Sequence, residues 1–370
     1  MSKPVIATVL PPSEIFSPQS AGAIALMVAR LFARSERFAP VVLGPASPLP
    51  PFTGVSFQAV RPAFRPLRRA LRYAMGVRRM VRALAPALIE VHNRPDIADF
   101  LARVSAVPIV LCLQNDPQDM RATKTAAARA ALIARLAGVI VASSFLRARF
   151  LEGLPPDAAT RVCVVPNCLD LAALPQAAQT RAPEILYVGR VVADKGVDGF
   201  AAACASALPR LPGWRASIIG ADRFGAGSPE TPFLRAIRAQ AARAGIVMQG
   251  YRTHDQVLAA MAQAAIIAAP SRWAEPFGLT AIEAMASGAA LMTTRRGALP
   301  DLAGDAAVYI DPDDPDGMAA AMVALANDPE RRAALAAHGR AAVRRFDCAA
   351  ILPELEQVRQ ELMAARATMP

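Results

Sequence analysis

The sequence predicts an α/β fold in which two doubly wound domains face each other across a cleft. Its 370 residues are enough for two domains, each with a core of its own. β-Branched apolar runs alternate with helical stretches rich in Ala, Leu and Arg, as in parallel sheets covered by helices. The alternation restarts after the polar stretch 175–183. We therefore predict one domain at 1–176, a second at 177–349, and a helix at 350–370 that packs back on the first.

Apolar runs mark the expected strands of both domains. In the first half they are Val5–Leu10, Val41–Leu43, Val55–Val60, Leu88–Val91, Ile109–Leu113, Val139–Ala142 and Val162–Val165. In the second half they are Ile185–Val188, Ala216–Ile219, Ile246–Gln249, Ala265–Ala268, Ala290–Thr293 and Val308–Ile310. Ligands of doubly wound sheets bind beyond the carboxyl ends of the strands, so the loops that follow these runs are where functional residues are expected.

Composition and hydropathy favour a folded protein without a membrane span. Apolar residues make up 54% of the chain and charged residues 19%, which is typical of folded domains. The longest nearly apolar run, Val257–Pro270, is shorter than the roughly 20 residues that cross a bilayer. The run Val5–Leu10 ends at Pro11 and is too short for a secretory signal. We expect a cytoplasmic protein.

The cysteines show no disulfide or zinc pattern. They are Cys112, Cys163, Cys168, Cys204 and Cys348. Their number is odd, they are far apart in the sequence, and no CxxC motif occurs. We expect them to be reduced and mostly buried.

Positive charge is concentrated in the first half of the chain. The residues up to Arg181 include 22 Lys and Arg against 10 Asp and Glu, which gives +12, and the rest include 19 against 20, which gives −1. The two values sum to the net charge of +11. Such asymmetry indicates an anionic partner for the first half. Nucleic acid is not expected, because no recognised binding module occurs and aromatic residues make up only 5%.

The excess is greatest between Arg61 and Arg82, where no acidic residue occurs. The arginines are Arg61, Arg65, Arg68, Arg69, Arg72, Arg78, Arg79 and Arg82, and apolar residues at helical spacing are Phe64, Leu67, Leu71, Ala74, Met75, Met80 and Val81. This pattern predicts a helix that lies on an anionic membrane or grips an anionic lipid-linked acceptor. An ordinary helix with a solvated arginine face is the alternative. The membrane interpretation predicts peripheral association with the inner face of the cytoplasmic membrane.

The second domain opens with a strand that ends at Gly189. Arg190 follows directly, and Lys195 precedes Gly196 where a helix is expected to begin. This spacing places a guanidinium and an ammonium group at the carboxyl edge of the sheet. The pair suits two adjacent phosphates, because arginine binds phosphate as a planar fork and lysine as a point charge. A solvated arginine and a lysine at a helix start are the structural alternative.

The segment from Glu275 to Glu283 is the strongest functional signal in the chain. Pro276 and Gly278 indicate a loop, and the residues from Leu279 on predict a helix. Backbone N–H groups at Gly278–Thr280 would form an anion site at the start of this helix. Glu275 would lie on the loop. Glu283 lies in an otherwise apolar helix, which is costly unless its carboxylate binds hydroxyls or other donors. The alternative is that both glutamates are plain surface residues.

Four segments carry a resemblance to a known family. They are GRVVADKG at 189–196, EPFGLTAIEAMASG at 275–288, VPNCLD at 165–170 and GALPDL at 297–302. In order and spacing they resemble glycosyltransferase family 4 over almost the whole chain. The resemblance implies the two-lobed GT-B fold, a nucleoside-diphosphate sugar bound mainly by the C-terminal domain, and transfer with retention of configuration.

The resemblance also implies roles for single residues. Arg190 and Lys195, beside Gly189, would hold the diphosphate, Glu275 the hydroxyls of the donor sugar, and Glu283 the ribose. Backbone groups would contact sugar and phosphate at Phe277, Gly278, Leu279 and Thr280, and Tyr251 would lie near the base. In the first domain, Gly22 resembles the glycine loop that faces the donor phosphates, although Ala23 replaces a second glycine.

The chain departs from the family at the end of the strand Ile109–Leu113. Gln114 stands where many members have a histidine that contacts the reacting sugar, and Asn115 and Asp116 follow. Gln114 keeps a hydrogen-bonding role, or His92 or Asp116 supplies what is missing, or activity is impaired. Asp116 is a candidate acceptor base. His92 ends the preceding strand and is either a ligand-facing group or a structural histidine.

The same residues predict a mechanism without a metal. Since no nucleophile is placed on the reactive face, we expect transfer on one face of the sugar through an oxocarbenium-like state. Arg190, Lys195 and the helix start would stabilise charge on the leaving diphosphate. Asp311-Pro-Asp313 and Asp314-Pro-Asp316 match DxD, a metal-binding signature elsewhere, but their position between a strand and a helix predicts turn and N-cap residues.

The leading hypothesis is therefore an enzyme that moves a hexose-type sugar from a UDP- or GDP-sugar to a glycan or lipid-linked acceptor. Lipopolysaccharide, capsule or exopolysaccharide synthesis in bacteria would fit. One alternative is a nucleotide-sugar epimerase on the same fold. Another is a non-catalytic, membrane-associated subunit that binds a nucleotide-sugar. A dinucleotide oxidoreductase is not expected, because no GxGxxG follows Leu10 or Val188.

Overall fold

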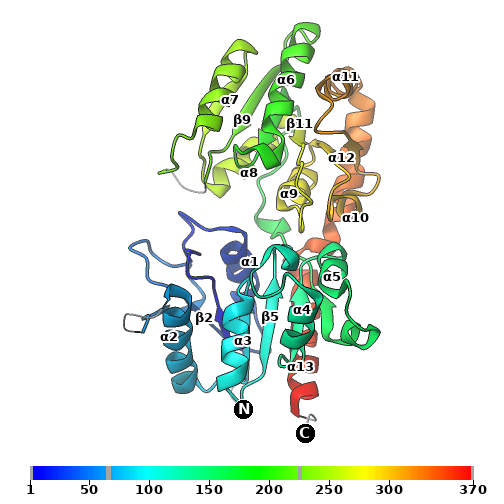
Figure 1. The fold of residues 1–370 in the computed structure, drawn as a ribbon. Helices are drawn as coiled ribbons and strands as arrows, with labels where there is room; N and C mark the ends of the chain where they lie inside the picture. The colour runs from blue at the N-terminus through cyan, green and yellow to red at the C-terminus, as the bar shows by residue number, and fades with distance from the viewer. Residues whose placement is uncertain (1–2, 64–67, 224–226, 368–370) are drawn as a thin grey trace. The chain divides into compact units, whose positions relative to one another are not determined.

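The computed structural model describes residues 3–63, 68–223 and 227–367. The chain divides into two compact units (Figure 1). Unit 1 runs from the N-terminus to Leu169 and resumes at Cys348, and unit 2 comprises Asp170–Asp347. The boundaries predicted at 176 and 349 lie a few residues beyond these points. Phe64, Arg65 and Leu67, which were predicted on the basic helix, lie outside the described residues.

Unit 1 contains a parallel sheet with strand order β3-β2-β1-β4-β5-β6-β7. The strands are β1 (Val5–Val9), β2 (Ala39–Pro45), β3 (Ser56–Val60), β4 (Leu88–His92), β5 (Ile109–Leu113), β6 (Gly138–Val141) and β7 (Val162–Val164). The helices are α1 (Ala23–Phe32), α2 (Arg69–Leu84), α3 (Pro95–Val104), α4 (Ala126–Ile133), α5 (Ser144–Leu151) and α13 (Cys348–Ala367). Each strand predicted in the first half is confirmed, with ends shifted by at most a few residues.

The last helix, α13, is fastened to unit 1 by a buried ion pair. Arg359 donates to both carboxylate oxygens of Glu90 at 2.7 and 2.8 Å, and the two side chains are 0% and 2% exposed. Thr8 on β1 donates to the same carboxylate at 3.1 Å. Arg359 Nη1 has no hydrogen-bond partner among the described residues, so the carboxylate of Glu90 supplies the charge that compensates the buried guanidinium there. The pair therefore fixes the position of α13 against β4.

Unit 2 contains a second parallel sheet, with strand order β10-β9-β8-β11-β12-β13. The strands are β8 (Ala182–Val188), β9 (Arg215–Ile219), β10 (Val247–Gly250), β11 (Ala264–Ala269), β12 (Ala290–Thr293) and β13 (Ala307–Tyr309). The helices are α6 (Val197–Ala207), α7 (Pro232–Arg243), α8 (His254–Gln263), α9 (Leu279–Ser287), α10 (Leu299–Ala303), α11 (Pro315–Ala326) and α12 (Pro329–Ala342). The strands predicted in the second half are confirmed.

Both sheets are doubly wound in the Rossmann manner. In each, the strand order reverses between the first strand and the fourth, which are β1 and β4 in unit 1 and β8 and β11 in unit 2. Ligands of such sheets bind in the crevice at this reversal. Ligand-binding residues are therefore expected in the loops after β1 and β4 in unit 1 and after β8 and β11 in unit 2.

The buried face of helix α2 differs from the apolar face predicted for the basic helix. Its buried residues are Tyr73, Ala74, Gly76, Val77 and Val81, so Ala74 and Val81 pack against unit 1. Leu71 and Met75, predicted on the same face, are instead 36% and 37% exposed. The reason is that Tyr73, Val77 and Val81, spaced four residues apart, form the stripe that faces the core. In the described part of the chain, no helix is both long and apolar enough to span a membrane.

Candidate functional site

The loop after β8 is shaped by its contact with the loop after β11. Gly196 has a φ of +67°, and a Cβ there would lie 1.9 Å from the carbonyl oxygen of Pro270. Only glycine fits such a close approach in the left-handed region. The backbone N–H groups of Arg272 and Trp273 both donate to the carbonyl of Asp194, at 2.9 and 3.0 Å. The two loops at the strand-order reversal are thus joined into one structure.

Lys195 and Glu275 meet where these loops join. The Lys195 Nζ lies 2.5 Å from Glu275 Oε1, and the side chains are 20% and 14% exposed. The ammonium group also lies over the ring of Trp273, 5.0 Å from its centroid. The sequence predicts phosphate binding for Lys195 and sugar binding for Glu275, and the structure brings the two side chains into direct contact. A cation and a carboxylate are therefore held side by side, where a ligand carrying both phosphate and hydroxyl groups could bind.

Arg190 lies in the same loop, directly after Gly189. Both residues are half-buried. The N–H of Gly189 continues the sheet by donating to Ile219, at 3.1 Å. The carbonyl of Arg190 accepts from the Tyr187 hydroxyl at 2.8 Å. The backbone of Arg190 is thus held by the sheet, while its guanidinium makes no hydrogen bond or ion pair with the described residues.

Arg272 braces the loop after β11, a role that the sequence analysis missed. Its guanidinium pairs with Asp198 at 2.6 Å and with Asp313 at 2.5 Å. Hydrogen bonds to these carboxylates, first to Asp198, raise the pKa of Arg272. An arginine between the small Ser271 and the aromatic Trp273 carries no spacing signal for this role. It holds the backbone that leads to Glu275.

Helix α9 begins where the sequence predicts an anion site. Gly278 is the N-cap residue with a φ of +112°, no side chain caps the helix within the described part of the chain, and its first turn contains no acid. The exposed N–H groups at such a start carry partial positive charge. A Cβ at Gly278 would lie 2.8 Å from a methyl of Leu299. Glycine is therefore required here by internal packing, in addition to any ligand.

The residues around Gly278 divide between core and surface. Phe277 is 3% exposed and its ring meets that of Phe346 edge-on, with centroids 5.7 Å apart. Leu279 and Thr280 are half-buried in the first turn of α9. The Phe277 side chain therefore anchors the loop, which leaves only its backbone for the predicted ligand contact.

Glu283 has a partner that the sequence analysis did not identify. Its Oε1 lies 2.7 Å from Nε2 of His254, and its side chain is 7% exposed. His254 begins α8 directly after the loop that contains Tyr251, which is half-buried. The position of His254 four residues after β10 could have indicated it, because that loop was predicted to lie near the base. The contact with the imidazole offsets the free-energy cost of burying a carboxylate in an apolar helix.

The aspartates of the DxD-like stretch stabilise local structure. Asp314 is the N-cap of α11 and accepts from Gly317 N at 2.9 Å. Asp313 pairs with Arg272 and with Arg296, and Arg272 lowers the pKa of its carboxyl. The prediction of turn and N-cap residues is confirmed.

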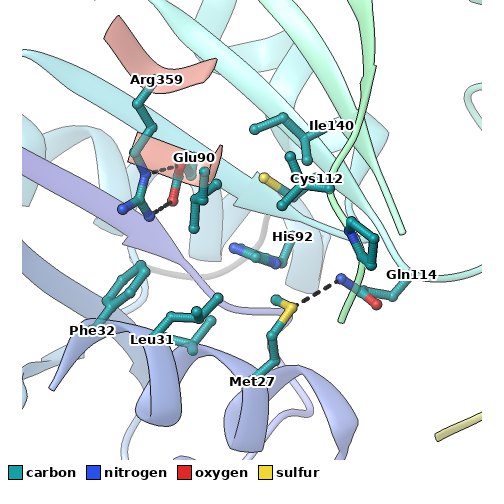
Figure 2. Close-up of a pocket in the computed structure, with 13 residues that line it drawn as sticks. Met27, Leu31, Phe32, Glu90, His92, Cys112, Gln114, Ile140 and Arg359 are labelled. Atoms are coloured by element: carbon teal, nitrogen blue, oxygen red, sulfur yellow. Dashed lines mark hydrogen bonds and ion pairs between the residues drawn. The ribbon is translucent and has the colours of Figure 1, made fainter. Parts of the chain in front are cut away.

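In unit 1, His92 lies at the end of β4 inside a small cavity. Figure 2 shows its ring between the Glu90–Arg359 pair and the contact of Gln114 with Met27. Burial lowers the pKa of His92 to about 4, although the negative charge of Glu90 opposes the shift. Neither ring nitrogen has a hydrogen-bond partner among the described residues. The imidazole is therefore neutral at physiological pH.

The volume of this cavity limits what it can hold. It measures about 30 Å³, enough for a water molecule and far below the several hundred Å³ of typical ligand pockets. Cys112 also lines it, and one ligand atom each from Glu90, His92 and Cys112 lie within 4.8 Å of one another. Arg359 already neutralises both oxygens of Glu90, so we assign no metal to this cluster.

Gln114, Asn115 and Asp116 follow β5 and have different environments. The Gln114 amide lies 3.4 Å from the sulfur of Met27, and Asn115 is exposed. Asp116 is 7% exposed. It accepts from Gln118 N at 2.8 Å and from Arg149 Nε at 2.7 Å. Its use as an acceptor base would require breaking the bond to Arg149.

At the end of β1, a carboxylate of the chain itself lies at the start of α1. Glu14 accepts from the N–H of Ala25 at 3.1 Å, and burial raises the pKa of its carboxyl. A Cβ at Gly22, the N-cap residue, would lie 2.6 Å from the same carboxylate. Gly22 therefore makes room for Glu14, and a donor phosphate at this helix start would have to displace it.

Comparison with known sequences places both units in one family. A model described as glycosyltransferase family 4 matches residues 22–173, and one described as glycosyl transferases group 1 matches residues 175–342. A glycogen synthase of Mycobacterium tuberculosis is 33% identical over 53% of this chain and 47% of its own length. LpsB of Rhizobium meliloti, a lipopolysaccharide core biosynthesis mannosyltransferase, is 32% identical over 41% and 43%. The chain spans about half the length of these curated relatives.

Similarity at lower identity extends over the whole chain. A phosphatidyl-myo-inositol mannosyltransferase of Mycobacterium tuberculosis is 26% identical over 88% of this chain and 89% of its own length. A sucrose-phosphate synthase from Thermosynechococcus elongatus superposes with a TM-score of 0.80 at 19% identity, over 98% and 100% of the two chains. HepE of Anabaena, in complex with UDP-glucose, superposes with a TM-score of 0.76 at 17% identity, over 97% and 99%. The superpositions show that the chain has the GT-B fold, and the two family models, which together match residues 22–173 and 175–342, show that it belongs to glycosyltransferase family 4.

Proposed function

We propose that the chain is a retaining glycosyltransferase that moves a hexose-type sugar from a UDP- or GDP-sugar to a glycan or lipid-linked acceptor. The contact between Lys195 and Glu275 at the strand-order reversal of unit 2 carries this proposal. It lies in one loop system with Arg190 and with the uncapped start of α9. Phosphate would bind the cations and the helix start, and sugar hydroxyls would donate to Glu275.

The proposed chemistry needs charge stabilisation more than proton transfer. When the bond between sugar and diphosphate breaks, negative charge builds on the leaving group. Arg190, Lys195 and the N–H groups of α9 would stabilise that charge through preorganised donors. The leaving phosphate would accept the proton of the acceptor hydroxyl on the same face of the sugar, which gives retention. We propose that this step requires no metal.

Donor binding can be tested with a thermal-shift panel of UDP-, GDP- and ADP-sugars. We expect one nucleotide class to raise the unfolding temperature, because a ligand that binds only the folded state stabilises it. The same sugar-nucleotide should have less effect on Lys195→Ala. Its effect should be unchanged on the control Arg243→Ala, an exposed residue in the last turn of α7. Absence of any shift across the panel would contradict the proposal.

Turnover separates the proposal from its alternatives. A nucleotide-sugar epimerase would convert the donor alone into an epimer, whereas a transferase would release the nucleotide only with an acceptor or slowly with water. A non-catalytic subunit would bind the donor and show no turnover with any acceptor. The lipopolysaccharide core and phosphatidyl-inositol mannosyltransferases among the relatives support a lipid-linked acceptor and guide the first choice of acceptors.

A cavity in unit 1 suits an anionic acceptor. It measures about 320 Å³, within the range of ligand pockets, and lies beyond the carboxyl ends of β1, β2 and β3. Its lining includes Pro12, Pro45, Val60, Arg69, Arg72 and Tyr73. The first turn of α2, which supplies Arg69 and Arg72, contains no acid. We propose that these arginines bind a phosphate or carboxylate of the acceptor.

This acceptor site can be tested with glycerol 3-phosphate as a probe. Arg69→Gln with Arg72→Gln should weaken its binding by about tenfold or more, since each lost charge-assisted contact removes about 1 kcal/mol or more. The matched control is Arg79→Gln with Arg82→Gln, which removes the same charge further along α2. Equal weakening by both variants would show a general charge effect and contradict the site.

The outer face of α2 suits an anionic membrane surface. Leu71 and Met75 are exposed there, as are Arg68, Arg79 and Arg82. Apolar side chains among arginines are typical of helices that lie at the surface of anionic bilayers. We therefore propose peripheral membrane association through this face.

Co-sedimentation with liposomes tests the membrane face. We expect binding that requires anionic lipid and weakens with salt, because surface charges are screened. Leu71→Ser with Met75→Ser should reduce binding while leaving the net charge unchanged. Absence of binding at low salt would contradict the proposal, without affecting the proposal for donor binding.

A further inference from the structure

Two cysteines that are distant in sequence meet at the place where the chain leaves and re-enters unit 1. Cys168 lies one residue before the division at Leu169, and Cys348 is the first residue after the return. They are separated by 180 positions in the sequence, and their Sγ atoms are 2.8 Å apart. Both residues are buried, at 0% and 1% exposure. No disulfide is expected from the sequence, because its cysteines lie far apart along the chain.

The backbone around the two sulfurs holds them together. Cys348 N donates to the carbonyl of Leu169 at 2.8 Å, and Arg30 on α1 donates to the carbonyl of Cys168 at 2.9 Å. A disulfide bond requires a sulfur–sulfur distance of about 2.0 Å. Small rotations about the Cα–Cβ bonds would bring the sulfurs to that distance. Neither the fold nor the proposed function accounts for the contact.

We propose that Cys168 and Cys348 form a disulfide when the protein meets a peroxide. One thiol loses its proton, and the thiolate attacks an oxygen of hydrogen peroxide, so that an S–O bond forms and the O–O bond breaks. The hydroxide that leaves takes up the proton released by the thiol, and a sulfenic acid and water result. The second thiol then attacks the sulfenic sulfur, so that the S–S bond forms and a second water leaves. Two thiols are oxidised and one hydrogen peroxide is reduced to two waters.

The environment of the pair makes this reaction conditional. The contact with Cys348 and burial raise the pKa of Cys168, and Arg30 and Arg34 oppose that shift. Since the thiolate is the reactive form, oxidation is slow in the folded protein and requires local opening at the start of α13. Once formed, the bond would close a loop that contains all of unit 2, and it would hold α13 in addition to the Glu90–Arg359 pair.

The first experiment treats the reduced protein with hydrogen peroxide, alkylates the remaining thiols, and identifies linked peptides by mass spectrometry. We expect one linked pair, containing Cys168 and Cys348. The unfolding temperature of the oxidised protein should rise by roughly 5–10 °C, because closing a long loop restricts the unfolded chain. Cys348→Ser should abolish both effects, and the matched control Cys163→Ser should abolish neither.

The second experiment refolds the protein from denaturant in a glutathione redox buffer, which removes any barrier of access. The linked pair should again be Cys168–Cys348. The ratio of linked to unlinked pair should be at least tenfold higher in the folded than in the unfolded chain. No such preference would overturn the disulfide site. If the pair forms preferentially in the glutathione buffer but peroxide does not link it in the folded protein, the proposed response to peroxide is overturned.

Discussion

The carboxyl edges of the two sheets use their charged residues differently. In unit 2, Lys195 contacts Glu275 and His254 contacts Glu283. The first pair joins the loops after β8 and β11, at the strand-order reversal, and its two members were expected to bind different parts of the same donor. The second pair joins the start of α8 to α9, and only Glu283 was expected to bind the donor. The cation of one pair and the helix start at Gly278 remain suited to phosphate.

In unit 1, the corresponding residues stabilise the fold itself. Asp116 pairs with Arg149, Glu14 caps α1, and Glu90 pairs with Arg359 in the core. Among these residues, those of unit 2 are proposed to meet a ligand, whereas those of unit 1 are paired within the fold. It follows that substitution of Asp116, Glu14 or Glu90 should change stability more than the rate of transfer. Substitution of Lys195 or Glu275 should do the reverse.

The largest expected effect on stability is that of Arg359→Leu. It leaves the carboxylate of Glu90 buried without its partner, which costs about 3–5 kcal/mol. Chemical denaturation would measure the loss. The double variant Glu90→Leu with Arg359→Leu should recover part of it, because no buried charge remains. Equal losses in the single and double variants would show that the ion pair itself is not the cause.

The largest expected effect on rate is that of Glu275→Gln or Lys195→Ala. Each removes one preorganised charge at the proposed reacting centre, and we expect a loss of about 10²–10³ in kcat/KM. The free energy of unfolding should change by about 1 kcal/mol or less, since the pair is partly exposed. A loss of stability larger than the loss in rate would reverse the comparison between the units.

The pH dependence of stability should report His92. Its pKa falls from the ordinary 6.5 to about 4 in the folded protein. Above pH 6.5 the residue is neutral in both states. As the pH falls towards 4, the unfolded chain binds the proton first, so the free energy of unfolding decreases by up to about 3 kcal/mol. His92→Gln should flatten this part of the profile, and an unchanged profile would show that His92 is not buried neutral.

Glu283→Gln should weaken donor binding by about tenfold and change kcat little. The carboxylate is proposed to bind the ribose, which takes no part in bond breaking, so its loss removes ground-state and transition-state binding alike. Initial rates at varied donor concentration separate the two parameters. A fall in kcat at unchanged KM would place Glu283 nearer to the reacting atoms than proposed.

Asp116→Asn should have the smallest effect on rate, less than about tenfold. Asparagine can still accept from Gln118, while the charge that pairs with Arg149 is lost at a cost of about 1 kcal/mol in stability. A loss of 10³ or more in kcat, with a pH–rate profile that loses one limb, would instead identify Asp116 as the acceptor base.

Much of unit 2 could be predicted because its candidate functional residues are close in sequence. Glu275, Gly278 and Glu283 lie in one segment, and Lys195 follows the first strand of the same sheet, so strand position was enough to bring them together. The partner of Glu283 was missed, because His254 comes from another loop and carries no motif of its own. Arg272 was missed because its partners Asp198 and Asp313 come from other segments.

Unit 1 was harder to predict because its contacts join distant segments. Glu90 and Arg359 are 269 positions apart, and Cys168 and Cys348 are 180 apart. The burial of His92 and the carboxylate of Glu14 at Gly22 depend on how helices cover the sheet, which alternation of apolar residues does not specify. The apolar face of α2 that packs on the core also differs from the predicted one. It contains Tyr73 and Val77, whereas Leu71 and Met75 are exposed.

Titration calorimetry with a UDP- or GDP-sugar tests the central claim most directly. The claim is that the edge of unit 2 built around Lys195 and Glu275 binds the donor. We predict saturable binding that weakens at least tenfold in Lys195→Ala and stays within threefold in His92→Gln. Unchanged affinity in Lys195→Ala, or an equal loss in His92→Gln, would contradict it.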